Sequence, residues 1–341
     1  DDRTSRGLGD VYKRQVYTNL NNEQISDFLK LYTIGKLISF TGITEGIESS
    51  NFHLKTTSGE FILTIFEKRV NKKDLPFFIN VMKHLSKKKF FCPRPISDAK
   101  DNYLQDLLGK PAIIVNYLQG KSKTKITIED CYKVGSKIAL MHIKTRDFGS
   151  ERENSLSING CQNLIKKCDV SIPNDILNKI EPNILKEIQN SFNYCVKFWP
   201  YNLPKGFIHA DIFPDNVFFH ENKLSGIIDF YFSCTDILSY DLAIAINAWS
   251  FDHEKIFNQK KYQSLLDGYN SQRKLSSDEI FYLPLLSKVA SMRFLLTRLY
   301  DWVHTPKDAD VLPKNPAEYI NKLKHFREVV EKINYHETYQ L

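Results

Sequence analysis

The stretch that decides the fold is FIHADIFPDNVFFHENKLSGIIDF, residues 207–230. Its apolar runs predict short strands at Phe207-Ile208, at 217–219 and at Ile227-Ile228. Pro214 predicts a loop between the first two runs, and the polar residues 221–225 predict a hairpin turn. Such a hairpin would return Asp229 to the side of Asn216. The stretch therefore gathers polar side chains at one place in a β-rich segment.

These polar residues fit the pattern HxDxxxxN at His209, Asp211 and Asn216, with Asp229 thirteen residues after the asparagine. Phosphoryl transfer from a magnesium nucleotide needs a carboxylate that orients and deprotonates the attacking hydroxyl, and oxygen ligands for Mg²⁺. We assign Asp211 as the base, and Asn216 and Asp229 as the metal ligands. The alternative is a loop whose Asp and Asn side chains only cap turns.

The chain around this stretch divides into two parts that differ in predicted secondary structure. Residues 23–32 predict a short helix, 40–68 predict strands with a turn at 56–59, 74–89 predict a helix, and 111–120 predict a buried strand. After Gly120 helices dominate: Thr127 caps one that runs to about Lys144, another covers about 176–198, and more follow from 239. The sequence predicts a small β-rich N-terminal part and a larger helical part.

A second candidate segment is GITEGIESSN, residues 42–51, between two predicted strands. Gly42 and Gly46 give a flexible backbone, and the hydroxyls of Ser49 and Ser50, with Asn51 beside them, add polar groups. We expect this segment to wrap the phosphates of a nucleotide. Adenine contacts are expected from backbone groups around Val115 to Tyr117.

Composition narrows the class of protein. The 341 residues are 42% hydrophobic and 26% charged, which is typical of a globular protein with a substantial core. No stretch resembles a membrane span of about 20 apolar residues, so we expect no membrane crossing. The six cysteines form no CxxC pair, which argues against zinc and a disulfide framework and favours the cytoplasm. Residues 1–15 lack an initiator Met, and we expect them to be a non-native leader.

The formal net charge of +7 comes largely from lysine clusters near predicted loops and helix ends. Those clusters are Lys68 to Lys73, Lys87 to Lys89 and Lys121 to Lys125. They lack the interleaved aromatic residues of a stacking platform. We interpret them as solvated faces and expect no nucleic-acid partner.

The chain closely resembles the homoserine kinases of the aminoglycoside phosphotransferase and choline kinase superfamily, relatives of protein kinases. The resemblance runs from about Val16 to Asp301. It is carried by VYTNL, GITEGIESSNFHL, FILTIFE, GKPAIIVNYLQG, HADIFPDNVFF…GIIDFYFSCTDILSYDLAIAINAW and MRFLLTRLYDW. It implies a bilobal α+β kinase-like fold, with a small antiparallel N-terminal lobe at 16–116 and a mostly helical C-terminal lobe at 117–341.

The resemblance also implies roles for single residues. Asp211 matches the catalytic aspartate, and Asn216 and Asp229 match the metal ligands, while His209 braces the loop. Asp241 and His142 match residues that are mainly structural. One departure concerns Thr64, which occupies the place where kinase-like folds carry a lysine for the phosphates, and the predicted helix at 74–89 contains no Glu to pair with it. Homoserine kinases carry Thr there too, and Lys55 or Lys68 would supply the charge.

The expected reaction is ATP- and Mg²⁺-dependent phosphorylation of L-homoserine, a step of threonine biosynthesis. Its zwitterionic acceptor needs a cation for the carboxylate and an anion for the ammonium. Arg293 and Asp236 are the candidates. Arg298, on another face of the same predicted helix, would form a structural ion pair with Asp301 or another acid. Two alternatives stay open: a kinase for another alcohol such as an aminoglycoside, choline or a sugar, and a catalytically weak nucleotide-binding pseudokinase.

Overall fold

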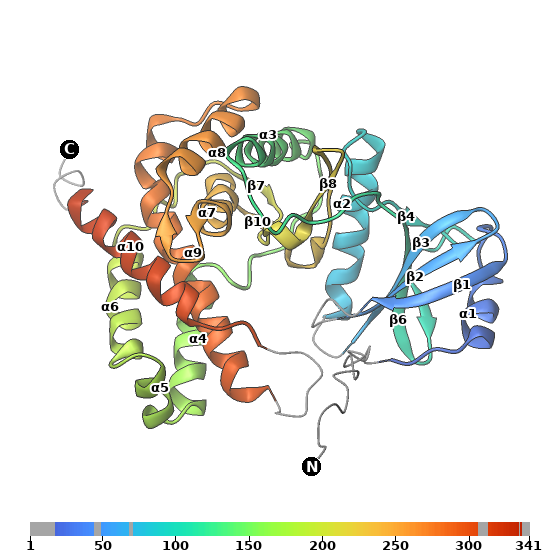
Figure 1. Ribbon diagram of the computed structural model, residues 1–341, viewed down its shortest axis with the longest axis horizontal. Coiled ribbons are helices and arrows are strands. Elements are labelled where there is room, and N and C mark those ends of the chain that lie inside the picture. The colour runs from blue at the N-terminus through green and yellow to red at the C-terminus, as the bar shows by residue number, and fades with distance from the viewer. Residues whose placement is uncertain (1–17, 44–48, 68–70, 306–312, 334, 336–341) are drawn as a thin grey trace, which may run out of the picture. The chain divides into compact units, whose positions relative to one another are not determined.

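The computed structural model of the chain describes residues 18–43, 49–67, 71–305, 313–333 and 335 (Figure 1). Its contacts divide the chain into two compact units. The first consists of Asp1–Val70, Ile96–Val115 and Lys307–Leu312, and the second of Asn71–Pro95, Asn116–Pro306 and Pro313–Leu341. Each unit is described below by itself.

The first unit is built on a six-stranded sheet of order β1-β2-β3-β6-β4, with β5 paired to β6. Its elements are α1 (Asn22–Leu29), β1 (Leu37–Ile43), β2 (Ser49–Thr56), β3 (Gly59–Phe66), β4 (Pro95–Ile96), β5 (Gln105–Leu107) and β6 (Lys110–Asn116). The β1–β2 and β2–β3 pairs are antiparallel, and β2 and β3 form the predicted hairpin, with Thr56 opposite Gly59. The antiparallel N-terminal sheet is thus confirmed.

Helix α1 covers one face of this sheet. Its apolar side chains Ile25 and Phe28 share a core with Phe52 and Leu54 of β2 and with residues of β3 and β6. Since side chains alternate along a strand, Ser50 lies on the same face as Phe52, while Ser49 and Asn51 lie on the opposite face. A capping box at Asn21 fixes the start of α1, because Asn21 and Gln24 each bond the other's main-chain N–H.

The second unit is mostly helical. Its helices are η1 (Lys72–Asp74), α2 (Leu75–Lys87), α3 (Ile128–Lys144), α4 (Ile158–Ser171), α5 (Asn174–Ile180), α6 (Ile184–Lys197), η2 (Pro214–Asn216), η3 (Phe230–Phe232), α7 (Leu238–Trp249), α8 (Gln259–Gln272), α9 (Ser277–His304) and α10 (Ala317–Ile333). Its short strands are β7 (Lys205–Ile208), β8 (Val217–His220), β9 (Lys223–Ile227), β10 (Cys234–Ile237), β11 (Phe251–Asp252) and β12 (Ile256–Phe257).

The helix predicted from Thr127 to Lys144 is confirmed as α3. Thr127 and Asp130 form a capping box at its start, and Val134, Ile138 and Met141 are buried as expected. The prediction of one helix over 176–198 is wrong. Pro182 and Asn183, the latter in the left-handed region at φ 58°, separate α5 from α6, because proline excludes the preceding residue from helical backbone angles.

Helices α3 and α8 cross at two glycines that face each other's backbone. A Cβ at Gly135 would lie 2.0 Å from the main-chain O of Leu265, and a Cβ at Gly268 would lie 2.0 Å from that of Tyr132. No other residue type fits either position without moving a helix, so the two glycines set the spacing of α3 and α8.

Helix α9 is the long central helix of the second unit (Figure 1). Its apolar 18-residue window has a mean hydropathy of 1.3, so by length and composition alone it could cross a membrane, contrary to our reading of the sequence. However, 72% of that window is buried inside the protein, and the helix carries Lys288, Arg293 and Arg298. This burial is typical of a core helix.

Candidate active site

The segment from β7 to β10 of the second unit forms the candidate site. Strand β7 pairs antiparallel with β10, and the chain leaves β7 at Ile208 to enter the loop that carries His209 and Asp211. The predicted hairpin is confirmed: β8 pairs with β9, Val217 lies opposite Ile227, and the N–H of Ile228 donates to the main-chain O of Asn216 at 3.0 Å. The hairpin therefore returns the chain to Asn216 one residue before Asp229.

Asn216 is tied to Asp211. Its Nδ2 donates to both the main-chain O and the Oδ2 of Asp211, each at 2.9 Å. The side-chain amide is thus fixed in orientation with its Nδ2 turned to Asp211, which leaves Oδ1 as the atom suited to a metal.

The electrostatics of Asp211 reflect a crowded acidic site. Burial is the main cause that raises its pKa to about 7, and the negative charge of Asp229 raises it further. The charges of Arg293 and Lys314 act in the opposite direction, and Asp215 adds a smaller raising effect. A carboxyl group whose pKa lies near neutrality is suited to accept and release a proton at physiological pH.

The donor set fits Mg²⁺. This ion takes oxygen ligands, prefers one or two carboxylates and leaves its remaining positions to phosphate and water. Asn216 Oδ1 and the carboxylate of Asp229 supply such a set, and the effect of Asp229 on the pKa of Asp211 shows that negative charge accumulates here. A cation at this place would relieve that repulsion.

His209 connects the loop to the segment that carries Asp229. Its Nε2 lies 2.9 Å from the main-chain O of Ile228, and because a carbonyl only accepts, Nε2 carries the proton. Burial lowers the pKa of His209, which keeps the ring neutral. The ring also meets Phe230 edge-on with centroids 4.8 Å apart. These contacts are those that a loop-bracing histidine requires.

Asp241 at the start of α7 holds the backbone of the same loop. Its Oδ2 accepts from the N–H of His209 at 2.9 Å and its Oδ1 from that of Ala210 at 2.8 Å. His142 Nε2 of α3 donates to Oδ2 at 3.2 Å, and His142 Nδ1 lies 2.8 Å from the hydroxyl of Tyr269. Burial opposes ionisation of Asp241, but the bonds from both histidines outweigh it and lower the pKa.

Outside the β8–β9 turn, two residues of this segment have left-handed backbones, Ala210 at φ 64° and Asp229 at φ 63°. For a residue with a Cβ this region costs about 1 kcal/mol or more and persists only where the surroundings enforce it. Both positions adjoin or carry a site carboxylate, and such strain is concentrated at functional sites.

Residues of the N-terminal segment fall into three groups. Gly46 lies outside the described residues, and Gly42 is the next-to-last residue of β1, which ends at Ile43. Thr64 donates to Asn51 Oδ1 at 2.8 Å, and Asn51 Nδ2 donates to Ser49 Oγ at 3.2 Å, so these three side chains share the sheet face opposite α1. At the place where kinase-like folds carry a lysine, Thr64 therefore belongs to a chain of hydrogen bonds with Asn51 and Ser49.

Ser50 differs from its neighbours because its side chain is fully buried on the α1 face. Its Oγ donates to Glu67 Oε1 at 2.7 Å and accepts from the N–H of Thr18 at 3.0 Å. Lys110 completes this cluster with a 2.6 Å ion pair to Glu67. The hydroxyl of Ser50 is thus committed to the core of the first unit.

Lys55 and Lys68 are the two candidates to supply the positive charge that a kinase lysine would bring to the phosphates. Lys55 is exposed on β2, opposite Glu60, and Lys68 lies outside the described residues.

The residues expected to contact adenine lie around the end of β6. Val115 is buried near the end of this strand, and Tyr117 is exposed just after it. The main-chain O of Tyr117 accepts a hydrogen bond from Asn116 Nδ2 at 3.2 Å.

Asp236 of β10 lies in the wall of a cavity of about 180 Å³ in the second unit. Its Oδ2 accepts from Asn154 Nδ2 at 2.6 Å, and burial raises its pKa above the ordinary value. The cavity is also lined by Glu153, Lys205 and the first residues of α4. Helix α4 and the loop before it, which the sequence did not predict, thus form part of its wall.

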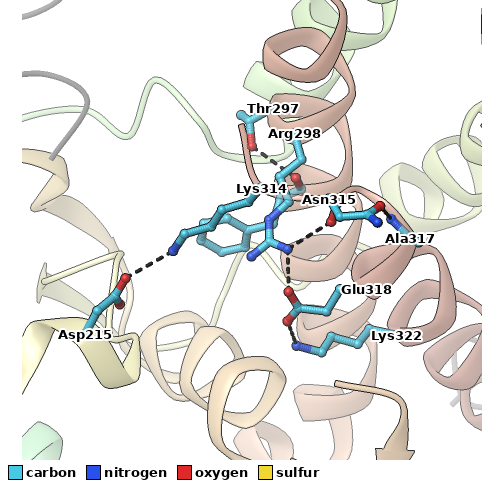
Figure 2. Close-up of polar contacts among 9 residues, drawn as sticks. Asp215, Thr297, Arg298, Lys314, Asn315, Ala317, Glu318 and Lys322 are labelled. Carbon is cyan, nitrogen blue, oxygen red and sulfur yellow. Dashed lines mark hydrogen bonds and ion pairs between the residues drawn. The ribbon is translucent and has the colours of Figure 1, made fainter. Parts of the chain in front are cut away.

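The two arginines of α9 have different partners, as expected from their spacing. Arg293 is 2% exposed, and its Nη1 donates to the main-chain O of Ala210 at 2.9 Å. Arg298 forms an ion pair with Glu318 of α10, which is an acid other than Asp301 (Figure 2). Arg293 does not line the cavity at Asp236.

A further ion pair was not foreseen. Lys314 Nζ lies 3.1 Å from Asp215 Oδ2, as Figure 2 shows, and 5.4 Å from the ring centre of Phe213. The segment before α10 therefore rests on the loop that contains Asp211. Since 99 residues separate the two charges, only the tertiary structure reveals the pair.

Known proteins are similar to this chain over nearly its whole length. Curated homoserine kinases of Brucella anthropi and Sinorhizobium fredii are each 42% identical over 320 residues, which cover 94% of this chain and 97% of each relative. That of Agrobacterium fabrum is also 42% identical and 98% covered.

Solved structures share the fold at low sequence identity. An amicoumacin kinase in complex with AMP-PNP and Ca²⁺ has a TM-score of 0.68 at 14% identity, covering 92% of this chain and 94% of its own. A microcompartment-associated aminopropanol kinase has a TM-score of 0.65 at 12% identity, covering 92% and 98%. A choline kinase of Cryptosporidium parvum has 0.61 at 15% identity, covering 93% and 99%. The bilobal kinase-like fold is confirmed.

The family model of the phosphotransferase enzymes matches residues 39–274, which include Asp211, Asn216 and Asp229. With a match over more than half of the chain, and with relatives at 42% identity over nearly all of it, the chain belongs to the phosphotransferase enzyme family.

Proposed function

We propose that the chain is a cytoplasmic, ATP-dependent homoserine kinase. It transfers the γ-phosphate of ATP to the hydroxyl of L-homoserine and forms O-phospho-L-homoserine for threonine biosynthesis. The observation that carries the proposal is the Asp211–Asn216 pair beside Asp229, in a chain that is 42% identical to homoserine kinases over 94% of its length.

Asp211 acts as the general base. Its carboxylate accepts the proton of the acceptor hydroxyl while the hydroxyl oxygen bonds to the γ-phosphorus. The bond from that phosphorus to the β–γ bridging oxygen breaks, ADP leaves with the electron pair, and Asp211 later releases its proton to water. The pKa of about 7 suits both halves of this cycle.

Asn216 and Asp229 hold Mg²⁺ in this proposal. The bound ion neutralises charge on the nucleotide phosphates. His209 keeps its bracing role, because its bond to Ile228 fixes the residue before Asp229.

Nucleotide contacts are proposed for the segment around Gly42 and Gly46 and for Ser49 and Asn51. Ser50 would contribute only its main chain, because its hydroxyl bonds to Glu67. The main chain at Val115 and Tyr117 is proposed to contact adenine.

The cavity at Asp236 supports a zwitterionic acceptor. Asp236 and Glu153 supply negative charge for the ammonium, while Lys205 supplies positive charge for the carboxylate. The first turn of α4 adds main-chain N–H groups at the positive end of the helix dipole, because Ile158 lines the same cavity. Choline and aminoglycosides carry no carboxylate and would leave Lys205 and these N–H groups without an anionic partner. We therefore place homoserine binding at Asp236.

Turnover with a panel of acceptors tests the proposal. The purified chain with ATP and Mg²⁺ is offered L-homoserine, choline, an aminoglycoside and a sugar, and products are identified by mass spectrometry. We expect O-phospho-L-homoserine as the main product, and a loss of about 10²–10⁴ in kcat for Asp211→Asn with nucleotide affinity kept. Preference for choline or an aminoglycoside would contradict the assigned substrate, and no turnover with any acceptor would indicate a pseudokinase.

A further inference from the structure

Ala210, the residue before Asp211, is held on both sides of its backbone. Its N–H donates to Asp241 Oδ1 at 2.8 Å, and its carbonyl accepts from Arg293 Nη1 at 2.9 Å. Ala210 also has a left-handed backbone, at φ 64°. The two bonds therefore hold the backbone of the residue that leads into Asp211.

Arg293 is remote in sequence, 83 residues after Ala210, and 2% exposed. Its guanidinium carbon lies 4.5 Å from the ring centre of Phe294 and 5.9 Å from that of Phe232. Its Nε has no hydrogen-bond partner, and its charge acts on Asp211 and Asp236 without a recorded ion pair to either carboxylate among the described residues. A buried cation with so few partners is costly in folding free energy.

Two other roles for Arg293 agree less well with these contacts. As a core residue it would fill space better as Met or Leu, without the cost of removing a charge from water. As a ligand of the acceptor carboxylate it would need access, but it is buried and is not among the residues that line the cavity at Asp236. The bond to Ala210 is its hydrogen bond to the backbone of the candidate site, and its charge also lowers the pKa of Asp211 and of Asp236.

We propose that Arg293 is a positioning residue, which holds the carbonyl of Ala210 so that Asp211 faces the acceptor hydroxyl. The inference rests on the proposed function in one respect, that Asp211 is the base. It applies to any alcohol that the enzyme phosphorylates, because every acceptor needs a correctly directed base. Together, Asp241 and Arg293 stabilise a backbone conformation that alanine rarely adopts.

The matched control is Arg298, which is also buried on α9 but bonds to Glu318 and to the main-chain O of Asn315 (Figure 2). Arg293→Met removes the donor and keeps most of the volume, Arg293→Lys keeps a donor and the charge, and Arg298→Met removes the control arginine. We expect Arg293→Met to lower kcat by about 10–100-fold, since a displacement of about 1 Å at a reacting group has effects of this size.

Whether a substitution of Arg293 changes kcat or KM distinguishes a positioning role from a substrate contact. A positioning role predicts that KM for the acceptor changes by less than about threefold, that Arg293→Lys recovers part of kcat, and that Arg298→Met lowers Tm but not kcat. The inference is overturned if Arg293→Met keeps the wild-type kcat. It is also overturned if KM for the acceptor rises while kcat is unchanged, which would indicate a substrate contact.

Hydrogen exchange gives a readout that needs no turnover. In Arg293→Met, and in Arg293→Lys should the first variant not fold, we expect peptides from 207–216 to exchange at least several-fold faster than in Arg298→Met of equal global stability. Equal exchange in the two arginine variants overturns the inference. If the wild-type chain phosphorylates no acceptor, the proposed function fails and the exchange result alone decides the role of Arg293.

Discussion

The Nδ2 atom of Asn216 lies 2.9 Å from both the main-chain O and the Oδ2 of Asp211. One amide therefore bonds to the backbone and the side chain of the proposed base, while its own Oδ1 is left for Mg²⁺. The proposed base and the proposed metal site are thus linked through a single residue, and we expect a change at one to disturb the other.

Replacing Asn216 by Ala removes both functions. We expect kcat to fall by at least about 10², because Asp211 loses its orienting donor and Mg²⁺ loses an oxygen ligand. Steady-state kinetics over a range of Mg²⁺ concentrations should also show that the variant needs a higher Mg²⁺ concentration to reach half of its maximal rate. Asn193→Ala, on the exposed side of α6, is the control and should keep wild-type kinetics. A variant at Asn216 with normal kcat would contradict the coupling.

Stability should depend on pH through Asp211. Its folded-state pKa, raised to about 7, lies above the ordinary value of 3.8, so the protonated carboxyl favours the folded state. That contribution is present below about pH 4 and is lost as the pH rises through about 7. Asp211→Asn avoids the buried charge and should raise Tm more at pH 8 than at pH 5, because the cost of the carboxylate begins above about pH 4 and grows until about pH 7. Differential scanning fluorimetry without nucleotide or Mg²⁺ checks this. An equal change in Tm at both pH values would show that the carboxylate carries no such cost.

Asp241 should matter for folding and activity together. Asp241→Asn cannot accept from two main-chain N–H groups and from His142 at once, because one of its oxygens is replaced by a donor. We expect a loss of about 2–4 kcal/mol in the free energy of unfolding, measured by urea titration, together with a lower kcat. The control Asp27→Asn, whose ion pair with Lys30 is exposed on both sides, should cost about 1 kcal/mol or less. An equal loss of unfolding free energy in both variants would contradict the role of Asp241 in holding the loop backbone.

Glu318 neutralises two buried cations of the second unit. Its carboxylate bonds to Arg298 and to Lys322, and Lys322 is 2% exposed (Figure 2). Burial raises the pKa of Glu318, but the charges of Lys322 and Arg298 outweigh it and lower the pKa, so this carboxylate stabilises the fold above about pH 4.5 and loses effect as the pH falls.

Glu318→Gln leaves both cations without a charged partner. We expect a loss of about 3–5 kcal/mol in the free energy of unfolding by urea titration at pH 7. Glu331→Gln, which removes an exposed acid 3.9 Å from Arg327, should change it by less than about 0.5 kcal/mol. A loss below about 1 kcal/mol for Glu318→Gln would mean that water solvates Arg298 and Lys322 in place of the carboxylate.

Local sequence signals predicted the parts of the site that lie close together along the chain. The turn residues after His220 predicted the hairpin that returns the chain to Asn216, and Thr127 predicted the start of α3. These predictions succeeded because turns and caps depend on a few neighbouring residues.

What the sequence could not predict depends on distant contacts. Helix α4 was missed because two of its buried positions are Cys161 and Cys168, which weaken its apolar pattern. No local signal joins Arg293 to Ala210 or Lys314 to Asp215, since 83 and 99 residues separate them. The burial of Ser50 followed from strand alternation only once the covered face of the sheet was known.

The glycines at the α3–α8 crossing connect packing to chemistry over a long path. Gly268 precedes Tyr269, and α3 carries both Gly135 and His142, so the close approach of the two backbones determines whether Tyr269 reaches His142 and, through it, Asp241. A methyl group at either glycine would push α3 and α8 apart, and we expect this displacement to lower the rate of phosphoryl transfer. Screens for loss-of-function variants should therefore recover Gly135 and Gly268 alongside the acidic residues, although neither glycine contacts the site.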